Sequence, residues 1–115
     1  MNSDEAHKAA LIWCPFPSLE QAELALNTLI AERFIACGNL MPDMRSVFVW
    51  GGTMEQSDEC GALLKTSAIK LEAAMERLHT LHPYETPAIT GWTVHASKGT
   101  LDWINAETEM VRGGG

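Results

Sequence analysis

The first apolar segment of the chain, residues 9–14, constrains the fold most. It is short and is followed by the sequence Pro-Phe-Pro, which favours a β-strand over a helix. Alternate residues of a strand point to opposite faces. Here both sets are apolar, because Leu11 and Trp13 point to one face while Ile12 and Cys14 point to the other. The strand must therefore be covered on both faces of its sheet.

Two amphipathic helices are predicted from apolar residues at helical spacing. The first begins after Ser18, which forms a capping box with Gln21, and runs to about Phe34. The second begins at Ser67 and must end before Pro83, since proline cannot continue a helix.

A long β-hairpin is predicted between these helices. Residues 45–50 are rich in β-branched and aromatic side chains, and the Gly-Gly sequence after them suits a tight turn into a return strand. A short apolar segment at residues 35–40 precedes them. Pro42 follows this segment and is expected at an edge or a bulge, because it cannot donate to a strand ladder.

A last strand is predicted at residues 88–94, then a turn at residues 98–100 and a short helix over residues 101–111. The order is βαββαβ with a C-terminal helix, which is the α+β arrangement of ferredoxin-like folds. Two helices cover one face of a four-stranded antiparallel sheet, and the C-terminal helix is too small to cover the other. We therefore expect like subunits to associate through sheet edges and faces.

Length and composition define the class of protein. A chain of 115 residues is one domain, expected over residues 9–111, with tails at residues 1–8 and 112–115. The net charge of −7 disfavours nucleic acid or an anionic membrane as a partner. No apolar segment approaches the roughly 20 residues of a spanning helix. The polar, acidic N-terminus and the odd number of cysteines indicate a cytoplasmic protein with free thiols.

The connector at residues 82–87 places several polar groups around two prolines. His82, Tyr84 and Glu85 all belong to it, and a passive linker does not need such groups. Two interpretations remain open for this segment. It is either a helix-to-strand corner in which Tyr84 only packs, or part of a functional site.

An ordered set of short motifs resembles the CutA family of divalent-cation tolerance proteins over about residues 9–106. The motifs are Ala36-Cys37 with Asn39 and Pro42, Ser46, Trp50-Gly51, Glu59, Leu64-Lys65-Thr66, His82-Pro83-Tyr84 with Pro87 and Ile89, and Leu101 with Trp103-Ile104. The resemblance implies a compact homotrimer of ferredoxin-like subunits, similar to PII signalling proteins, with clefts between subunits. It also implies a part in tolerance of divalent metals, and some bacterial members of the family are associated with copper.

The resemblance makes Cys14 and His82 the candidate metal ligands. Thiolate and imidazole are donors that soft Cu(I) accepts. Packing is the alternative role for Cys14, because a free cysteine in an apolar strand is most often a small core residue. The chain departs from the family where it has Leu81 in place of a histidine of some members, Ala88 in place of the usual Glu, and Pro15 in place of a common Thr.

Four further residues are expected at a subunit interface or cleft. Three are aromatic, and aromatic side chains dominate such contacts. The set comprises Trp50, Tyr84, Lys65 and Trp103.

The favoured function is a non-catalytic trimer that binds copper, another divalent metal or a small-molecule effector in its clefts. One alternative is a purely structural or PII-like signalling trimer without a metal site. The other is an enzyme that uses Cys14, His82 and Glu85. The sequence contains neither a phosphate loop nor paired catalytic carboxylates, which weighs against the enzyme.

Overall fold

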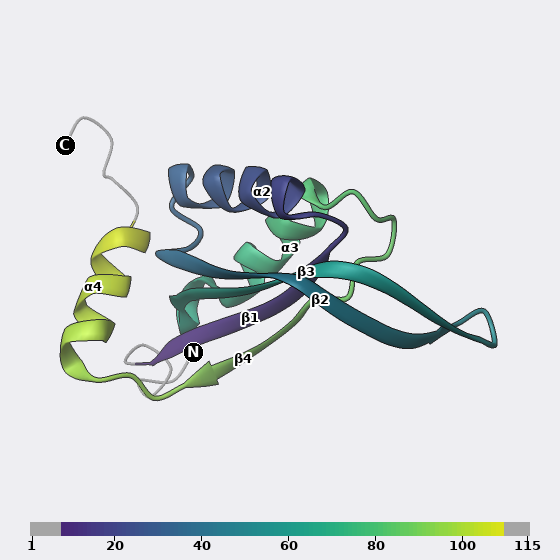
Figure 1. The fold of residues 1–115 in the computed structure, drawn as a ribbon. Helices are drawn as coiled ribbons and strands as arrows, with labels where there is room; N and C mark the ends of the chain where they lie inside the picture. The colour runs from purple at the N-terminus through teal and green to yellow at the C-terminus, as the bar shows by residue number, and fades with distance from the viewer. Residues whose placement is uncertain (1–7, 110–115) are drawn as a thin grey trace.

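The computed structural model describes residues 8–109, which form an α+β fold (Figure 1). Four strands form an antiparallel sheet in the order β2-β3-β1-β4, with bounds β1 (Ala9–Phe16), β2 (Cys37–Trp50), β3 (Thr53–Ser67) and β4 (Thr90–Val94). Helices α2 (Leu19–Ala31) and α3 (Leu71–Leu81) cover one face of the sheet, and α4 (Lys98–Thr108) follows β4. The predicted βαββαβ order with a C-terminal helix is confirmed. Apart from Lys8, the predicted tails at residues 1–8 and 112–115 lie outside the described residues.

Strand β1 lies in the middle of the sheet and pairs with both β3 and β4. Its Ile12, Cys14 and Phe16 side chains are fully buried under α2 and α3, as the apolar pattern requires. The strand continues two residues beyond the predicted end. Pro15 is tolerated there because β4 pairs with β1 only up to Trp13, so the ladder needs no donor from Pro15 on that side.

The ends of the first two helices differ slightly from the prediction. Ser18 caps α2, where its Oγ accepts from the Gln21 N–H at 3.2 Å. The helix ends at Ala31 and not near Phe34, because Arg33 adopts a φ of 64°, outside the helical region. Ser67 caps a single 3₁₀ turn (Ala68–Lys70), and α3 begins only after this turn.

The predicted turn at residues 98–100 is wrong, since these residues are the first turn of α4. Ser97 precedes the helix and accepts from the Leu101 N–H at 2.9 Å, which starts the helical ladder. The helix ends at Thr108; the last predicted positions, residues 110 and 111, lie outside the described part of the chain. Strand β4 begins at Thr90, two residues later than predicted, after the Pro87 corner.

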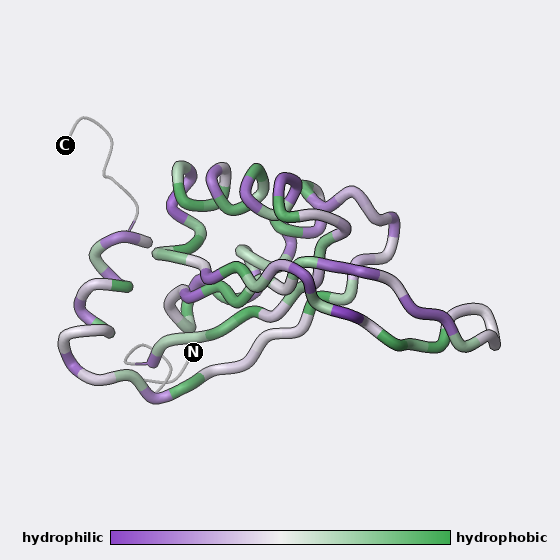
Figure 2. Tube along the Cα trace, viewed as in Figure 1, coloured by the Kyte–Doolittle hydropathy of each residue, from purple (hydrophilic) through white to green (hydrophobic). Residues whose placement is uncertain are grey.

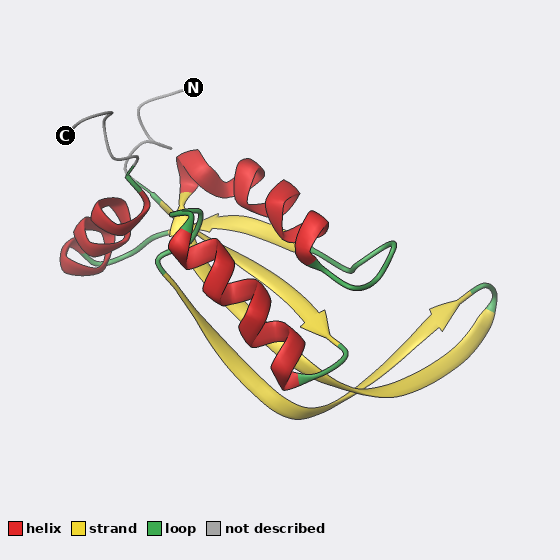
Figure 3. Cartoon of the chain, turned by 90° about the horizontal axis from the view of Figure 1, so that it is seen from above, coloured by secondary structure: helices red, strands yellow, loops and turns green. Residues whose placement is uncertain are grey.

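The β2–β3 hairpin extends well past the helices (Figure 3). Gly51 and Gly52 have φ values of 59° and 82°, which is the geometry of a tight hairpin turn. Strand β2 is continuous, and the two predicted segments are joined through a register shift between Met41 and Met44. The predicted irregularity at Pro42 is therefore confirmed.

The two faces of the sheet are covered unequally. Helix α4 packs against β3 and buries Ile104 and Thr108 at one end of the second face. The rest of that face and the outer hairpin keep apolar side chains at the surface, and Figure 2 shows hydrophobic segments in β1 and in the outer hairpin. No helix within residues 8–109 is long and apolar enough to span a membrane.

Candidate functional site

His82 joins the connector (residues 82–87) to strand β1. It caps the C-terminus of α3, is 7% exposed, and stacks on Phe16 with ring centroids 4.4 Å apart. Its Nε2 lies 2.8 Å from the Pro15 carbonyl oxygen, and its Nδ1 lies 3.1 Å from the Tyr84 backbone nitrogen. A carbonyl only accepts and an amide only donates, so Nε2 carries the proton and the ring is neutral. Burial holds the pKa of His82 below its usual value.

The connector directs Tyr84 onto strand β3. The Tyr84 hydroxyl donates to Glu59 Oε2 at 2.9 Å, which links the connector to the base of the hairpin. Burial, together with this hydrogen bond and the charge of Glu59, raises the pKa of Tyr84 to about 12. Tyr84 therefore remains a neutral donor at physiological pH, and its contact with Glu59 is charge-assisted.

Cys14 approaches the same carbonyl from the buried side of β1. Its Sγ lies 3.6 Å from the Pro15 oxygen, and the side chain is fully buried. Burial, followed by the charge of Glu59, raises the pKa of Cys14 to about 12. The structure thus places both candidate metal ligands, Cys14 and His82, beside the Pro15 carbonyl.

These groups do not fit a ready-made metal site in one protomer. Cys14 is a protonated thiol at neutral pH, whereas a metal takes the thiolate. Both ring nitrogens of His82 already have backbone partners, so a metal must displace one of them. Across residues 8–109, no three His, Cys, Asp or Glu side chains are grouped so that they could hold a metal ion. Copper ligation by Cys14 and His82 stays a prediction.

A cleft with a volume of about 830 Å³ lies between the outer hairpin and the connector. Residues 46–50 of β2 form one wall with Glu55 and Glu59 of β3, while residues 83–86 of the connector form the other. Trp50 and Tyr84, both predicted interface or cleft residues, line this cleft.

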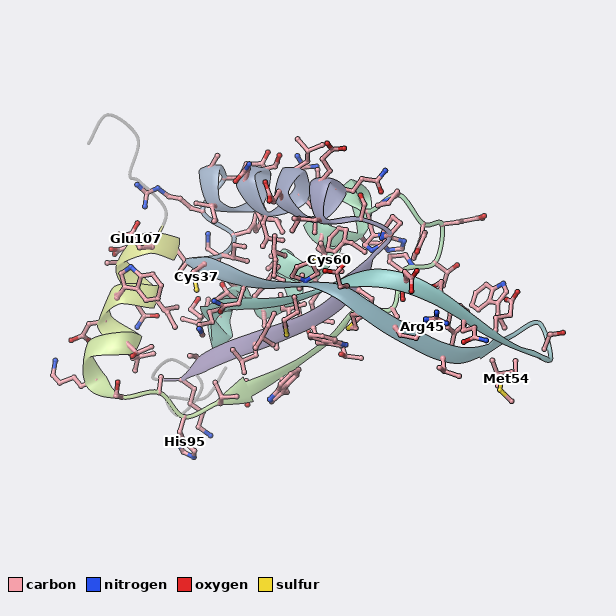
Figure 4. All side chains as sticks on the ribbon, viewed as in Figure 1. Cys37, Arg45, Met54, Cys60, His95 and Glu107 are labelled. Atoms are coloured by element: carbon pink, nitrogen blue, oxygen red, sulfur yellow. The ribbon has the colours of Figure 1, made fainter. Side chains whose placement is uncertain are left out.

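The two other predicted cleft residues lie elsewhere. The Lys65 Nζ donates to Asn39 Oδ1 at 3.2 Å, near the start of β2. Trp103 belongs to α4, at the end of the sheet opposite the hairpin (Figure 1). Figure 4 shows the same separation, with Cys37 and Glu107 at one end of the molecule and Arg45 and Met54 at the other. Lys65 and Trp103 therefore do not line the hairpin cleft, and their place at an interface stays a prediction.

Sequence reasoning missed Phe48 and Glu55 as lining residues of the cleft, and it named Glu85 as a connector residue without placing it opposite the hairpin. The first two form a pair across the hairpin, because Phe48 is opposite Glu55 in the register. This pairing could have been found by counting outward from the Gly-Gly turn. Nothing in the local sequence of Glu85 shows that the connector folds toward the hairpin.

The family model of the CutA1 divalent ion tolerance protein matches residues 10–107. The chain belongs to the CutA1 family. The divalent-cation tolerance protein CutA of Pyrococcus horikoshii is 39% identical over 100 residues, which cover 86% of this chain and 97% of that relative. The CutA of Citrobacter koseri is 33% identical over 100 residues, covering 86% of this chain and 87% of its own.

Solved CutA structures have the same fold as this chain. CutA1 from Ehrlichia chaffeensis superimposes with a TM-score of 0.85 at 30% identity, covering 90% of this chain and 98% of that one. CutA from Xylella fastidiosa has a TM-score of 0.84 at 35% identity, covering 88% and 98%. The CutA resemblance and the α+β, ferredoxin-like fold expected from the sequence are both confirmed.

The buried, neutral His82 predicts how stability depends on pH. Its pKa in the folded CutA protomer is lower than the value of 6.5 expected in the unfolded chain, so the unfolded chain takes up the proton first. The stabilisation is complete above pH 6.5 and is lost as the pH falls toward the folded-state pKa. We expect the free energy of unfolding in urea, at fixed protein concentration, to decrease as the pH falls below about 6.5.

The His82→Gln variant should lose this part of the pH dependence. His95→Gln is the matched control, because it makes the same substitution at an exposed position outside the bridge between Pro15 and Tyr84. An equal slope in wild type and His82→Gln would contradict the assignment of His82 as a neutral hydrogen-bonding bridge.

Proposed function

We propose that this protein is a homotrimer that acts in tolerance of, or response to, divalent metal ions without catalysing a reaction. The observation that carries the proposal is the open cleft beside an exposed apolar hairpin, which a neighbouring copy can cover and complete. The relatives and the family model are named for divalent cation tolerance, which supports the metal-related part.

Exposed apolar surface supports the assembly. Val49 and Trp50 of the hairpin are 68% and 62% exposed, and Trp92 on β4 is 44% exposed. Large contiguous apolar patches are rare on monomers and mark interaction sites. Strands β2 and β4 also leave their outer edges unpaired within the described sheet. A second and a third copy of the chain can cover these surfaces; the number three follows from the CutA resemblance.

The chemistry of the described side chains supports a role without catalysis. Cys14 is a protonated, fully buried thiol and therefore a poor nucleophile. His82 is held on both ring nitrogens by backbone groups and is not poised as a general base. Glu85 is the third residue of the enzyme alternative. It lines the cleft, whereas Cys14 and His82 do not.

The state of the thiols supports a cytoplasmic location. Cys14, Cys37 and Cys60 are all free, as expected in a reducing compartment. A measurement of free thiols on protein taken directly from cells, compared with a fractionation of those cells, tests this part of the proposal.

We expect sedimentation of the wild-type protein to give about three chain masses at micromolar concentration. Trp50→Ala should weaken this assembly by about 2 kcal/mol or more, because a tryptophan buried in an interface is a typical hot-spot residue. Leu24→Ala is the control, since Leu24 is exposed on the outer face of α2. A monomeric wild type, or a Trp50→Ala protein that associates as tightly as the wild type, would contradict the proposed interface.

Copper binding by Cys14, together with His82, should be weak, and no tight zinc site is expected. Two ligands are few for Zn(II), while Cu(I) accepts low coordination with soft donors. Affinity should fall in acid, because the thiol and the imidazole must both be free of protons. Calorimetry with Cu(I) should show weaker binding to Cys14→Ser than to wild type, and Cys37→Ser serves as the matched thiol control. Equal affinities in all three would remove Cys14 and favour the alternative of a signalling trimer without a metal site.

A further inference from the structure

The hairpin cleft combines aromatic and acidic side chains. Phe48 and Glu55 lie opposite one another in the β2–β3 register, and Trp50 lies two residues further along the same face of β2. Tyr84 faces them from the connector and holds Glu59 by its 2.9 Å hydrogen bond. Aromatic rings and carboxylates therefore meet in one concave space.

The described lining of the cleft carries negative charge only. Glu55, Glu59 and Glu85 line it, and no Lys, Arg or His is among the lining residues. Arg45 lies on the other face of the hairpin, where its Nε is 3.0 Å from Asp58 Oδ1 and its Nη1 donates to Gln56. The cleft accordingly has a negative potential, in a chain whose net charge is −7.

The same side chains are poorly arranged for a divalent metal ion. The carboxylates are spread over different walls, and residues 8–109 hold no group of three ligating side chains. One oxygen of Glu59 is already occupied by the Tyr84 hydroxyl. A hard divalent cation needs several converging oxygens, whereas an organic cation needs an aromatic face and a nearby carboxylate.

We propose that this cleft binds a small organic ammonium ion with an apolar body, of the arylalkylamine or alkylamine class. The ammonium group lies near Glu59 and the ring of Tyr84, and the apolar body packs on Phe48. The volume of about 830 Å³ is in the range of ordinary small-molecule sites, roughly 300–1,000 Å³. The inference rests on the proposed function, because it names the class of effector that the cleft accepts.

The test uses 2-phenylethylammonium chloride as the probe and calorimetry on the assembled wild-type protein. The neutral analogue 2-phenylethanol has the same apolar body without the charge. We expect saturable binding of the ammonium ion. The alcohol should bind at least about tenfold more weakly, since both the carboxylates and the aromatic faces attract the positive charge. Added salt should weaken only the binding of the ammonium ion.

Two matched variants locate the binding. Glu59→Gln keeps an oxygen for the Tyr84 hydroxyl but removes the charge, and it should reduce the affinity about tenfold. Glu72→Gln removes the same charge from the first turn of α3, outside the cleft, and should bind the probe as the wild type does.

Absence of saturable binding, equal affinity for the alcohol, or unchanged affinity in Glu59→Gln would each overturn the proposal. Sedimentation of the same samples separates this failure from failure of the proposed function. If the protein is a trimer and does not bind the probe, the proposed assembly stands and the proposal of an organic-cation site fails. A neighbouring copy that fills the cleft would give this result. A monomer contradicts the assembly itself.

Discussion

The two hydrogen bonds of the His82 ring are the interaction on which the site depends. One bond runs to the Pro15 carbonyl of β1 and the other comes from the Tyr84 amide, so a single neutral imidazole joins the central strand to the connector. This fixes the direction in which the chain leaves α3, and it lets the Tyr84 hydroxyl reach Glu59 on β3. The wall of the cleft that faces the hairpin therefore rests on one buried ring. Both ring nitrogens are hydrogen-bonded to backbone groups. The main role of the ring in the protomer is therefore to position other groups.

The unequal covering of the sheet is the second constraint. Strand β1 is apolar on both faces, but α2 and α3 cover one face only, and α4 reaches one end of the other. The hairpin then carries further apolar side chains beyond the helices, Trp50 among them. The exposed apolar side chains thus favour association with like chains, and they place the cleft near the surface where the chains would meet. The two proposals together predict that assembly and ligand binding are linked, since a ligand that binds the cleft only in the assembled form stabilises the assembly.

Much of the fold could be predicted because its signals are local. Ser18 marks the start of α2, the Gly-Gly turn marks the hairpin, and Pro83 limits α3. The predicted end of α2 is wrong because a single backbone conformation, at Arg33, ends the helix. The predicted start of α4 is wrong because the local sequence at Lys98 is only a weak signal for a helix. The site was less predictable. The partner of His82 is a backbone carbonyl that lies 67 positions away in the chain. A backbone acceptor cannot be predicted from a side-chain motif.

The protonation state of the His82 ring is the most direct test of this account. Nitrogen NMR of the imidazole at neutral pH, with His82→Gln used to assign the signals, reports which ring nitrogen carries the proton. We predict a neutral ring with a protonated Nε2 and an unprotonated Nδ1, which keeps this form on mild acidification because its pKa is lowered by burial. A ring protonated on Nδ1, or one that exchanges between tautomers at neutral pH, would contradict the account, because it could not bridge Pro15 and Tyr84.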